Sequence, residues 1–120
     1  MANMIKTTDY SKNQKQILIG QESYYIALPA VISGTANEVM YAGQPLAGDV
    51  KDRDAGFTAS TGESVGVLLH DVTFDTDGKA NGTIVLAGCV DLLKLENSVQ
   101  TAIESATGLD KIIFVKGSAY

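Results

Sequence analysis

The chain has 120 residues, of which 45% are hydrophobic, and its nine basic and fourteen acidic residues give a formal net charge of -5 at pH 7. A chain of this length buries roughly two-thirds of its unfolded surface, which is enough for one compact core. Its lysines and arginines form no block, so the pattern lacks the phosphate-neutralising surface of a nucleic-acid-binding protein. Composition therefore predicts a protein partner and no nucleic acid.

The sequence also indicates where the protein is made. Its single cysteine, Cys89, cannot close a disulfide within the chain, which suits a reducing compartment such as the cytoplasm. The longest apolar runs, at residues 26–32 and 84–90, are far shorter than the roughly 18 residues of a membrane span. The first residues lack the apolar centre of a signal peptide. We therefore expect neither membrane insertion nor secretion by that route.

The first part of the chain is polar and aperiodic. Residues 1–16 place Lys6, Lys12 and Lys15 among Asn, Gln, Ser and Thr, and such a segment buries too little apolar surface to order by itself. The apolar triplet at residues 17–19 suits either a docking strand of this segment or the first strand of the body. We predict a flexible arm over residues 1–20 and a single β-rich domain over residues 21–120.

Short strand patterns follow the arm. Residues 24–32 predict a strand interrupted by Pro29, which has no N–H to donate and therefore belongs at a sheet edge or a bend. Residues 38–41 predict another strand, and residues 42–48 a turn and strand. The Asp, Lys, Gly, Ser and Thr of residues 49–62 predict an exposed loop, anchored by Phe57.

Two β-branched runs, at residues 65–72 and 83–93, predict a hairpin. The linker between them is rich in turn-forming residues, namely Asp75, Asp77, Gly78, Asn81 and Gly82. Gly66 and Gly88 lie inside the strand patterns, where glycine usually marks a bulge, a bend or the close approach of another backbone. Such strands suit a small, strongly curved β structure.

The end of the sequence predicts one helix and one strand. Apolar residues three or four apart predict a helix over residues 92–106, with Gly108 placed to end it. The run at residues 111–116 predicts a strand buried on both faces. The fold class is therefore mainly β, a small bent sheet with one short helix, and the alternative is a small β-barrel or sandwich. The expected single core contains Val65, Val67, Leu69, Ile84, Leu86, Val90, Ile113 and Val115.

Residues capable of catalysis or metal binding are few. His70 and Cys89 could form a base and a thiolate nucleophile oriented by Asp71 or Asp91, but both lie in apolar runs, which favours packing roles. Asp71, Asp75 and Asp77 before Gly78 resemble a calcium loop that lacks its final glutamate, which favours an ordinary turn. No glycine spacing forms a phosphate loop. We therefore expect no enzyme activity, no metal and no cofactor.

Three segments together resemble the lambda-type head decoration proteins of bacteriophages. They are Ala42-Gly43-Gln44-Pro45-Leu46, then Val65-Gly66-Val67-Leu68-Leu69-His70-Asp71-Val72, and then Ile84-Val85-Leu86-Ala87-Gly88-Cys89-Val90-Asp91-Leu92. With the short helix and the closing strand, the resemblance covers about residues 23–116. It implies a β-clip body and homotrimers that bind the major capsid protein outside the expanded virion head and stabilise the capsid against DNA pressure.

In that family the segment ahead of the body adds a strand to a coat-protein sheet. The resemblance therefore implies capsid-binding residues in the arm, and the candidates are Met4, Ile5, Tyr10, Ile17, Leu18 and Ile19. Two other classes stay open. A small β-rich minor virion or tail component would be found on tails instead of heads. A cysteine hydrolase would expose Cys89 and react quickly with alkylating reagents.

Overall fold

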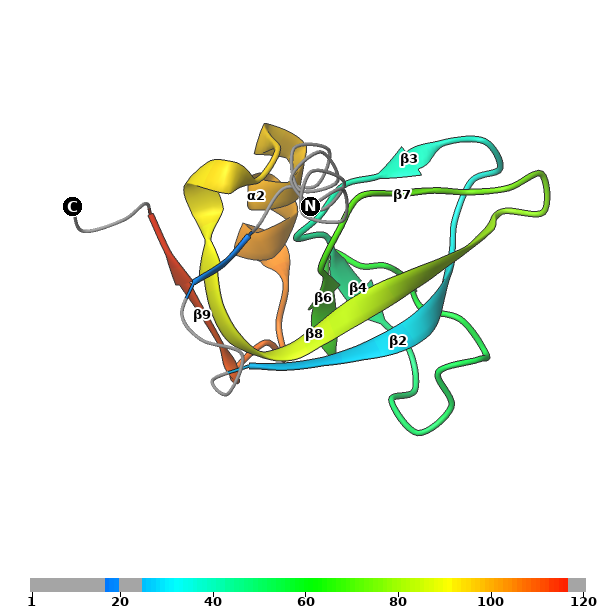
Figure 1. Ribbon diagram of the computed structural model, residues 1–120. Helices are drawn as coiled ribbons and strands as arrows, with labels where there is room; N and C mark the ends of the chain where they lie inside the picture. Colours follow the sequence, from blue (N-terminus) through cyan, green and yellow to red (C-terminus); the bar gives the residue numbers. More distant parts are fainter. Residues whose placement is uncertain (1–16, 20–24, 117–120) are drawn as a thin grey trace, which may run out of the picture.

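The computed structural model describes residues 17–19 and 25–116, which form short strands around one long strand (Figure 1). The strands are β1 (Leu18–Ile19), β2 (Ile26–Ser33), β3 (Val39–Met40), β4 (Pro45–Ala47), β5 (Thr58–Ala59), β6 (Gly66–Leu68), β7 (Val72–Thr73), β8 (Lys79–Asp91) and β9 (Ile112–Val115). One α-helix, α2 (Asn97–Ser105), follows a short 3-10 helix, η2 (Leu92–Lys94). The predicted mainly β fold is confirmed. The described sheets stay open and do not close into a barrel.

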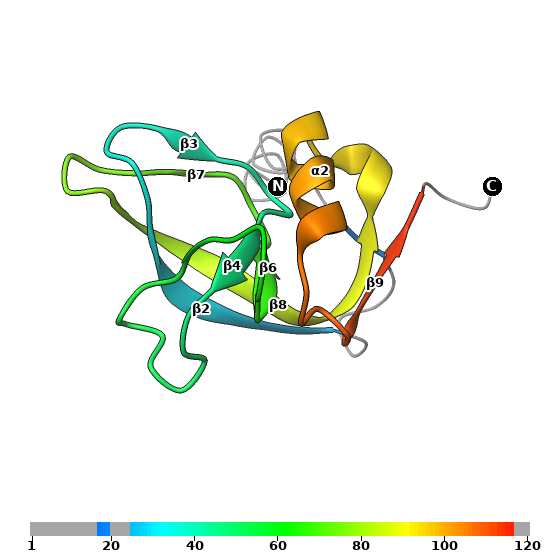
Figure 2. The same cartoon turned by 180° about the vertical axis from the view of Figure 1, so that it is seen from behind.

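Strand β8 organises the sheet because four other strands pair with it. Its first part lies between β2 and β6, both antiparallel to it. Its last part lies between β1, which is antiparallel, and β9, which is parallel. Strands β4 and β5 extend the sheet beyond β6, and β3 and β7 form a separate pair. Figure 2 shows from behind that β6 and β4 lie beside the middle of β8. Strand β9 and helix α2 lie toward the C-terminal end of β8.

Gly88 marks the place where β8 changes neighbours. Ala87 is the last β8 residue paired with β2, and the pairing with β9 starts at Gly88. Gly88 has φ +145°, and a Cβ there would collide with the Tyr25 side chain. The register of β2 also shifts between Ile26 and Ala27, which indicates a bulge. The irregularity that the sequence predicts at this glycine is confirmed, and it lets one strand serve two sets of neighbours.

The predicted hairpin is only partly right. β6 pairs with β8 as expected, but the first run breaks after Leu68, and β7 pairs with β3. The turn is also shorter than predicted, because Asn81 and Gly82 lie inside β8 opposite Val31 and Ala30. The side chains of Ile32, Leu68 and Val72 fill the space where Gly82 would carry a Cβ. These contacts with neighbouring segments therefore hold Asn81 and Gly82 in β8, although both residue types are rare in strands.

Strand β2 is continuous through Pro29, so the predicted interruption is wrong. The expected edge position is confirmed, because β8 is the only described strand that pairs along β2. The other side of β2 meets the loop before β5, where the Val31 N–H donates to the Arg53 carbonyl oxygen at 3.1 Å. The same loop inserts Phe57, which is fully buried, so its predicted anchoring role is confirmed.

The predicted helix over residues 92–106 is divided in two. The Asp91 side chain accepts a hydrogen bond from the Leu93 N–H at 3.0 Å and caps η2. Leu95 and Glu96 then adopt extended backbone angles before α2 begins. Leu95 is buried against Gly43, so the break directs an apolar side chain into the body. The described helix α2 ends at Ser105, before Gly108.

The core consists of two clusters, whereas the sequence predicts one. The first cluster lies between α2 and the bent end of β8, and it includes Ile17, Val67, Val85, Val90 and Val99. The second lies under β2 and β4, and it includes Ile32, Leu46, Phe57, Phe74 and Ile84. Of the predicted core residues, Val67, Ile84 and Val90 are fully buried, whereas Val65, Leu69, Leu86 and Val115 are partly buried. The predicted burial of both faces of the terminal strand is wrong, because Ile113 is 64% exposed.

Candidate functional site

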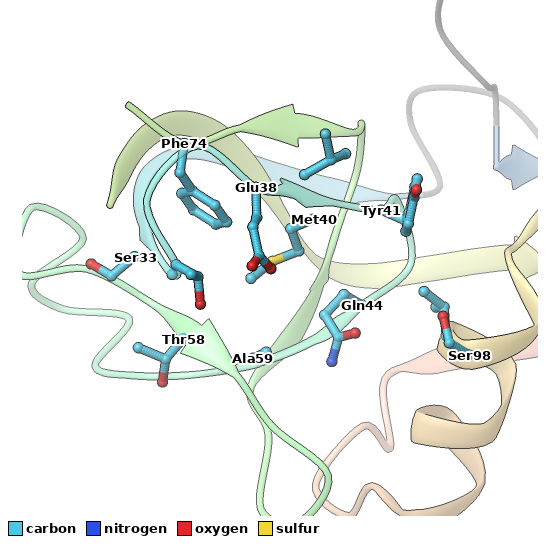
Figure 3. A pocket seen from close by; sticks show the side chains of 13 residues that line it. Ser33, Glu38, Met40, Tyr41, Gln44, Thr58, Ala59, Phe74 and Ser98 are labelled. Carbon is cyan, nitrogen blue, oxygen red and sulfur yellow. The ribbon is translucent and has the colours of Figure 1, made fainter. Parts of the chain in front are cut away.

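A hollow of about 560 Å³ lies beside β3, and we refer to it as the β3 groove (Figure 3). Four parts of the chain meet there: the residues after β2, the β3 segment through Gln44, β5, and the start of α2. Phe74, next to β7, completes the lining. The lining residues are Ser33, Gly34, Thr35, Glu38, Val39, Met40, Tyr41, Gln44, Thr58, Ala59, Phe74, Ser98 and Val99.

Backbone hydrogen bonds fix the wall of the groove that carries Glu38. The Phe74 N–H donates to the Glu38 carbonyl oxygen at 2.9 Å, and the Glu38 N–H donates to the Thr35 carbonyl oxygen at 3.2 Å. Because side chains alternate along an extended chain, Glu38 and Met40 share one face. Figure 3 shows both side chains directed into the hollow. The pairing of β3 with β7 therefore positions a carboxylate above an apolar surface.

The floor of the groove is apolar, and its rim is partly exposed. Met40, Phe74 and Val99 are buried and form the floor. At the rim, Val39 is 46% exposed and Tyr41 is 40% exposed. Because side chains alternate along the strand, the Tyr41 ring lies on the opposite face from Glu38 and Met40, and Figure 3 shows it turned away from the hollow.

Among the described residues that line the groove, Glu38 is the only charged one. At the edge of the groove, the Lys79 Nζ atom donates a hydrogen bond to the hydroxyl of the lining residue Ser33 at 3.0 Å. Among the described residues, no ion pair involves Glu38. The Gln44 side-chain amide donates to the carbonyl oxygens of Pro45 and Ser60, at 3.2 and 3.5 Å. The groove therefore presents one carboxylate beside a glutamine amide that is held by backbone carbonyl oxygens.

A second exposed feature crosses the other end of the sheet. Ile19 pairs with Cys89, and Cys89 pairs with Ile113, so the three side chains share one face of β1, β8 and β9. We call this set the outer row. Ile19 and Cys89 are half-buried and Ile113 is largely exposed. A hollow of about 390 Å³ on the other side of β9 is lined by Phe114 and the residues that follow α2. This end of the molecule combines an edge strand with apolar surface.

The structure does not bring His70 and Cys89 together. The Leu69 N–H donates to the Thr83 carbonyl oxygen at 2.9 Å, so His70 lies beside the middle of β8, whereas Cys89 lies six residues beyond Thr83. The His70 Nδ1 atom is buried and has no hydrogen-bond partner among the described residues. Cys89 is a free, half-buried thiol. The arrangement therefore does not place the predicted histidine base beside the cysteine.

The aspartates of the predicted turn bind backbone. The Asp75 Oδ1 atom accepts hydrogen bonds from the N–H groups of Asp77, at 2.9 Å, and Lys79, at 3.0 Å. Asp71 accepts a hydrogen bond from the Ala42 N–H at 2.8 Å. The predicted turn chemistry is confirmed at Asp75. Within residues 17–19 and 25–116, no group of three or more His, Cys, Asp or Glu side chains gathers as a metal site. No helix in the same ranges is long and apolar enough to cross a membrane.

The predicted arm residues fall into two groups. Met4, Ile5 and Tyr10 lie outside the described residues. Ile17 is fully buried, Leu18 is 7% exposed, and both belong to the first core cluster, while Ile19 pairs with Cys89. The structure therefore places residues 17–19 in the body, although the sequence predicted an arm through residue 20. An apolar triplet can mean either role, and its pairing partner in β8 lies too far along the chain to be recognised locally.

Sequence reasoning missed the β3 groove. Each sequence pattern is local: one predicts Glu38 and Tyr41 in a strand, another predicts Gln44 in a turn, and a third predicts Phe74 in a linker. Their proximity depends on the pairing of β3 with β7. Comparison of the chain with protein-family models, curated proteins and solved structures found no match.

Proposed function

We propose that this protein is a decoration protein of a bacteriophage head, which binds the outside of the expanded capsid and stabilises it. The observation that best supports the proposal concerns the three segments that resemble such proteins. They contain most of β4, all of β6 and residues 84–91 of β8, and these three strands are neighbours in one sheet. The resemblance therefore concerns one continuous piece of the body.

The exposed surfaces suit a protein that works by binding another protein. Among the described strands β9 pairs only with β8, which puts it at an edge, and its Ile113 side chain is exposed in the outer row. Edge strands and exposed apolar side chains are common features of protein interfaces. In this proposal the partners are the major capsid protein and two further copies of the chain, and the protein is located on the virion exterior. A contact repeated over a symmetric shell gains strength through effective concentration, even when each interface is modest.

The test uses expanded heads of the cognate phage that lack this protein. Adding the purified chain should raise the temperature at which these heads rupture, and the bound copies should number a multiple of three. Unexpanded shells should bind the chain poorly. A failure to bind expanded heads, or a copy number incompatible with three-fold sites, would contradict the proposal. Recovery of the chain with tails would favour a tail component instead.

The arm provides a sharper test of how binding occurs. Replacing Met4, Ile5 and Tyr10 together by serine removes the apolar side chains proposed to contact the coat protein. This variant should bind heads much more weakly than the original chain. The control replaces Thr7, Thr8 and Ser11 by alanine, which changes the same segment without removing apolar side chains. Equal losses in both variants would contradict a specific role for the apolar arm residues.

A further inference from the structure

The side of β9 that faces away from β8 is an unpaired sheet edge. Figures 1 and 2 both show β9 as the outermost strand at its end of the body. The register with β8 directs the N–H and C=O groups of Phe114 and the C=O group of Ile112 toward this outer side. The Ile112 N–H already donates to the Leu109 carbonyl oxygen at 3.1 Å. An extended segment beside β9 would therefore meet backbone groups that have no partner among the described residues, centred on Phe114.

The inner face of this edge borders an apolar hollow of about 390 Å³. Its apolar lining residues are Ile103, Ala106, Leu109 and Phe114, and none of the lining residues belongs to β8, as expected for a hollow on the free side of β9. Directly paired residues place their side chains on the same face, so the residue opposite Phe114 in an added strand would face the hollow. The next residue of that strand would face Ile113, which is 64% exposed. The two faces therefore favour an added strand with an apolar side chain on each face.

Two lysines flank the edge. Lys111 directly precedes β9 and Lys116 directly follows it, and the four residues between them are apolar. Both lysines are exposed, and neither forms an ion pair within the described part of the chain. Asp110 partly offsets the charge next to Lys111, so the end at Lys116 is the more positive one. An acidic residue at each end of the added strand would lie opposite a lysine.

The same lysines disfavour an occupant from the chain itself. If two copies paired their β9 strands antiparallel about Phe114, Lys116 of one copy would lie next to Lys111 of the other at both ends. Like charges in such cross-strand positions are destabilising. Residues 1–16 carry the same sign of charge, with three lysines and one aspartate. The charges therefore favour a segment of another protein.

We propose that the outer edge of β9 binds an extended segment of a partner protein with an apolar centre between two acidic residues. The segment runs antiparallel to β9, so that one of its residues exchanges two hydrogen bonds with Phe114. That residue fills the hollow, the next covers Ile113, and the acidic side chains contact Lys111 and Lys116. The whole chain has a net charge of -5, so this preference for an acidic segment is local to β9. The inference rests on the proposed function only for its suggestion that the partner is the coat protein.

The test titrates the full-length protein with the peptide acetyl-Glu-Thr-Leu-Val-Thr-Glu-amide and follows backbone amide signals by NMR. With the leucine opposite Phe114, the two glutamates lie opposite Lys116 and Lys111. The amides of Ile113, Phe114 and Val115 should shift progressively, with half-saturation in the millimolar range because ordering the peptide opposes binding. Near saturation, the Phe114 amide should exchange with solvent several-fold more slowly than in the free protein. No shift at β9 would overturn the proposal.

Two altered peptides test the backbone pairing and the hollow separately. Methylation of the leucine nitrogen removes the N–H that donates to the Phe114 carbonyl oxygen, while the side chains and the charge stay the same. Replacement of the leucine by serine removes the side chain that fills the hollow. Each change should weaken binding at least fivefold. Equal binding of either altered peptide and the original peptide would overturn the proposal, because general attraction would then explain the shifts.

A charge reversal tests the contact with Lys116. Lys116→Glu should weaken binding of the original peptide several-fold, and a peptide with lysine at its first position should restore it. Lys79→Glu makes the same change in charge at the far end of β8, where the lysine is also exposed, and it should keep the preference for the original peptide. Equal effects of the two variants, or restoration only by lysine at the last position of the peptide, would overturn the proposal. Phe114 shifts that depend on protein concentration without peptide would also overturn it, because a second copy would then occupy the edge.

Head binding distinguishes this inference from the proposed function. If the original peptide binds at β9 but heads do not bind the chain, the inference stands and the decoration role fails. If heads bind the chain but the peptide does not bind at β9, the decoration role stands and the inference fails.

Discussion

Gly66 and Val85 lie on neighbouring strands so close together that a Cβ on Gly66 would collide with the Val85 carbonyl oxygen. The same Cβ would also meet the Ile84 side chain, which is fully buried. Glycine at this position therefore allows β6 and β8 to approach each other.

Replacing Gly66 by alanine should lower the free energy of unfolding by about 1 to 3 kcal/mol, because the added methyl group forces neighbouring backbone to move. Gly62→Ala is the matched control, since a Cβ there meets nothing within 4 Å. Its effect should stay within about 0.5 kcal/mol. Chemical denaturation of both variants measures the difference, and equal stabilities would show that the strands can separate without cost.

The boundary between arm and body can be tested by two deletions. Removing residues 1–19 takes away Ile17 and Leu18, whose side chains belong to the first core cluster. Compared with a chain that lacks only residues 1–16, this deletion should cost several kcal/mol, since each large buried side chain contributes about 2 to 5 kcal/mol. Thermal unfolding of the two truncated chains gives the comparison. Identical melting temperatures would show that residues 17–19 do not stabilise the body and belong to the arm.

Two leucines with opposite environments test the described core. Leu46 in β4 is fully buried, and Leu46→Ala should lower the free energy of unfolding by about 2 to 5 kcal/mol. Leu93 in η2 is 65% exposed, and Leu93→Ala should change this free energy by no more than about 0.5 kcal/mol. Urea titrations provide both values. A larger loss at Leu93 would mean that another part of the protein covers it.

Hydrogen exchange can test the free edge of β9. The Gly88 N–H donates to the Lys111 carbonyl oxygen at 3.2 Å, and peptide groups alternate in direction along a strand. The register with β8 therefore directs the Val115 N–H toward β8 and the Phe114 N–H toward the outer edge. In the isolated protein, the Phe114 amide should exchange at least about tenfold faster than the Val115 amide. Equal protection would show that another strand already occupies the edge.

Features that depend on local patterns could be predicted from the sequence. The mainly β class, the buried Phe57, the turn at Asp75 and the irregularity at Gly88 all follow from residue preferences within a few positions. The break at Leu95 could not be predicted, because the apolar spacing continues through it while the backbone turns to bury that side chain. The exposure of Ile113 was missed for a similar reason. An apolar run does not reveal that one face of its strand is left uncovered, as it is at Ile113 next to the buried Ile112.

The candidate site was less predictable than the fold. Glu38 and Phe74 meet only because β3 pairs with β7, and neither strand is long enough to give a clear alternating pattern. Pairings of this kind depend on the whole topology.

The position of β8 has a consequence for how the chain folds. Its partners include β1, near one end of the chain, and β9, near the other, so many native contacts join residues that are distant in sequence. High contact order slows folding, and all-β domains of this type usually need milliseconds to seconds. During synthesis, Ile17 and Leu18 leave the ribosome long before Val90, against which they pack. These two apolar side chains must therefore stay without their native neighbours until most of the protein has been made.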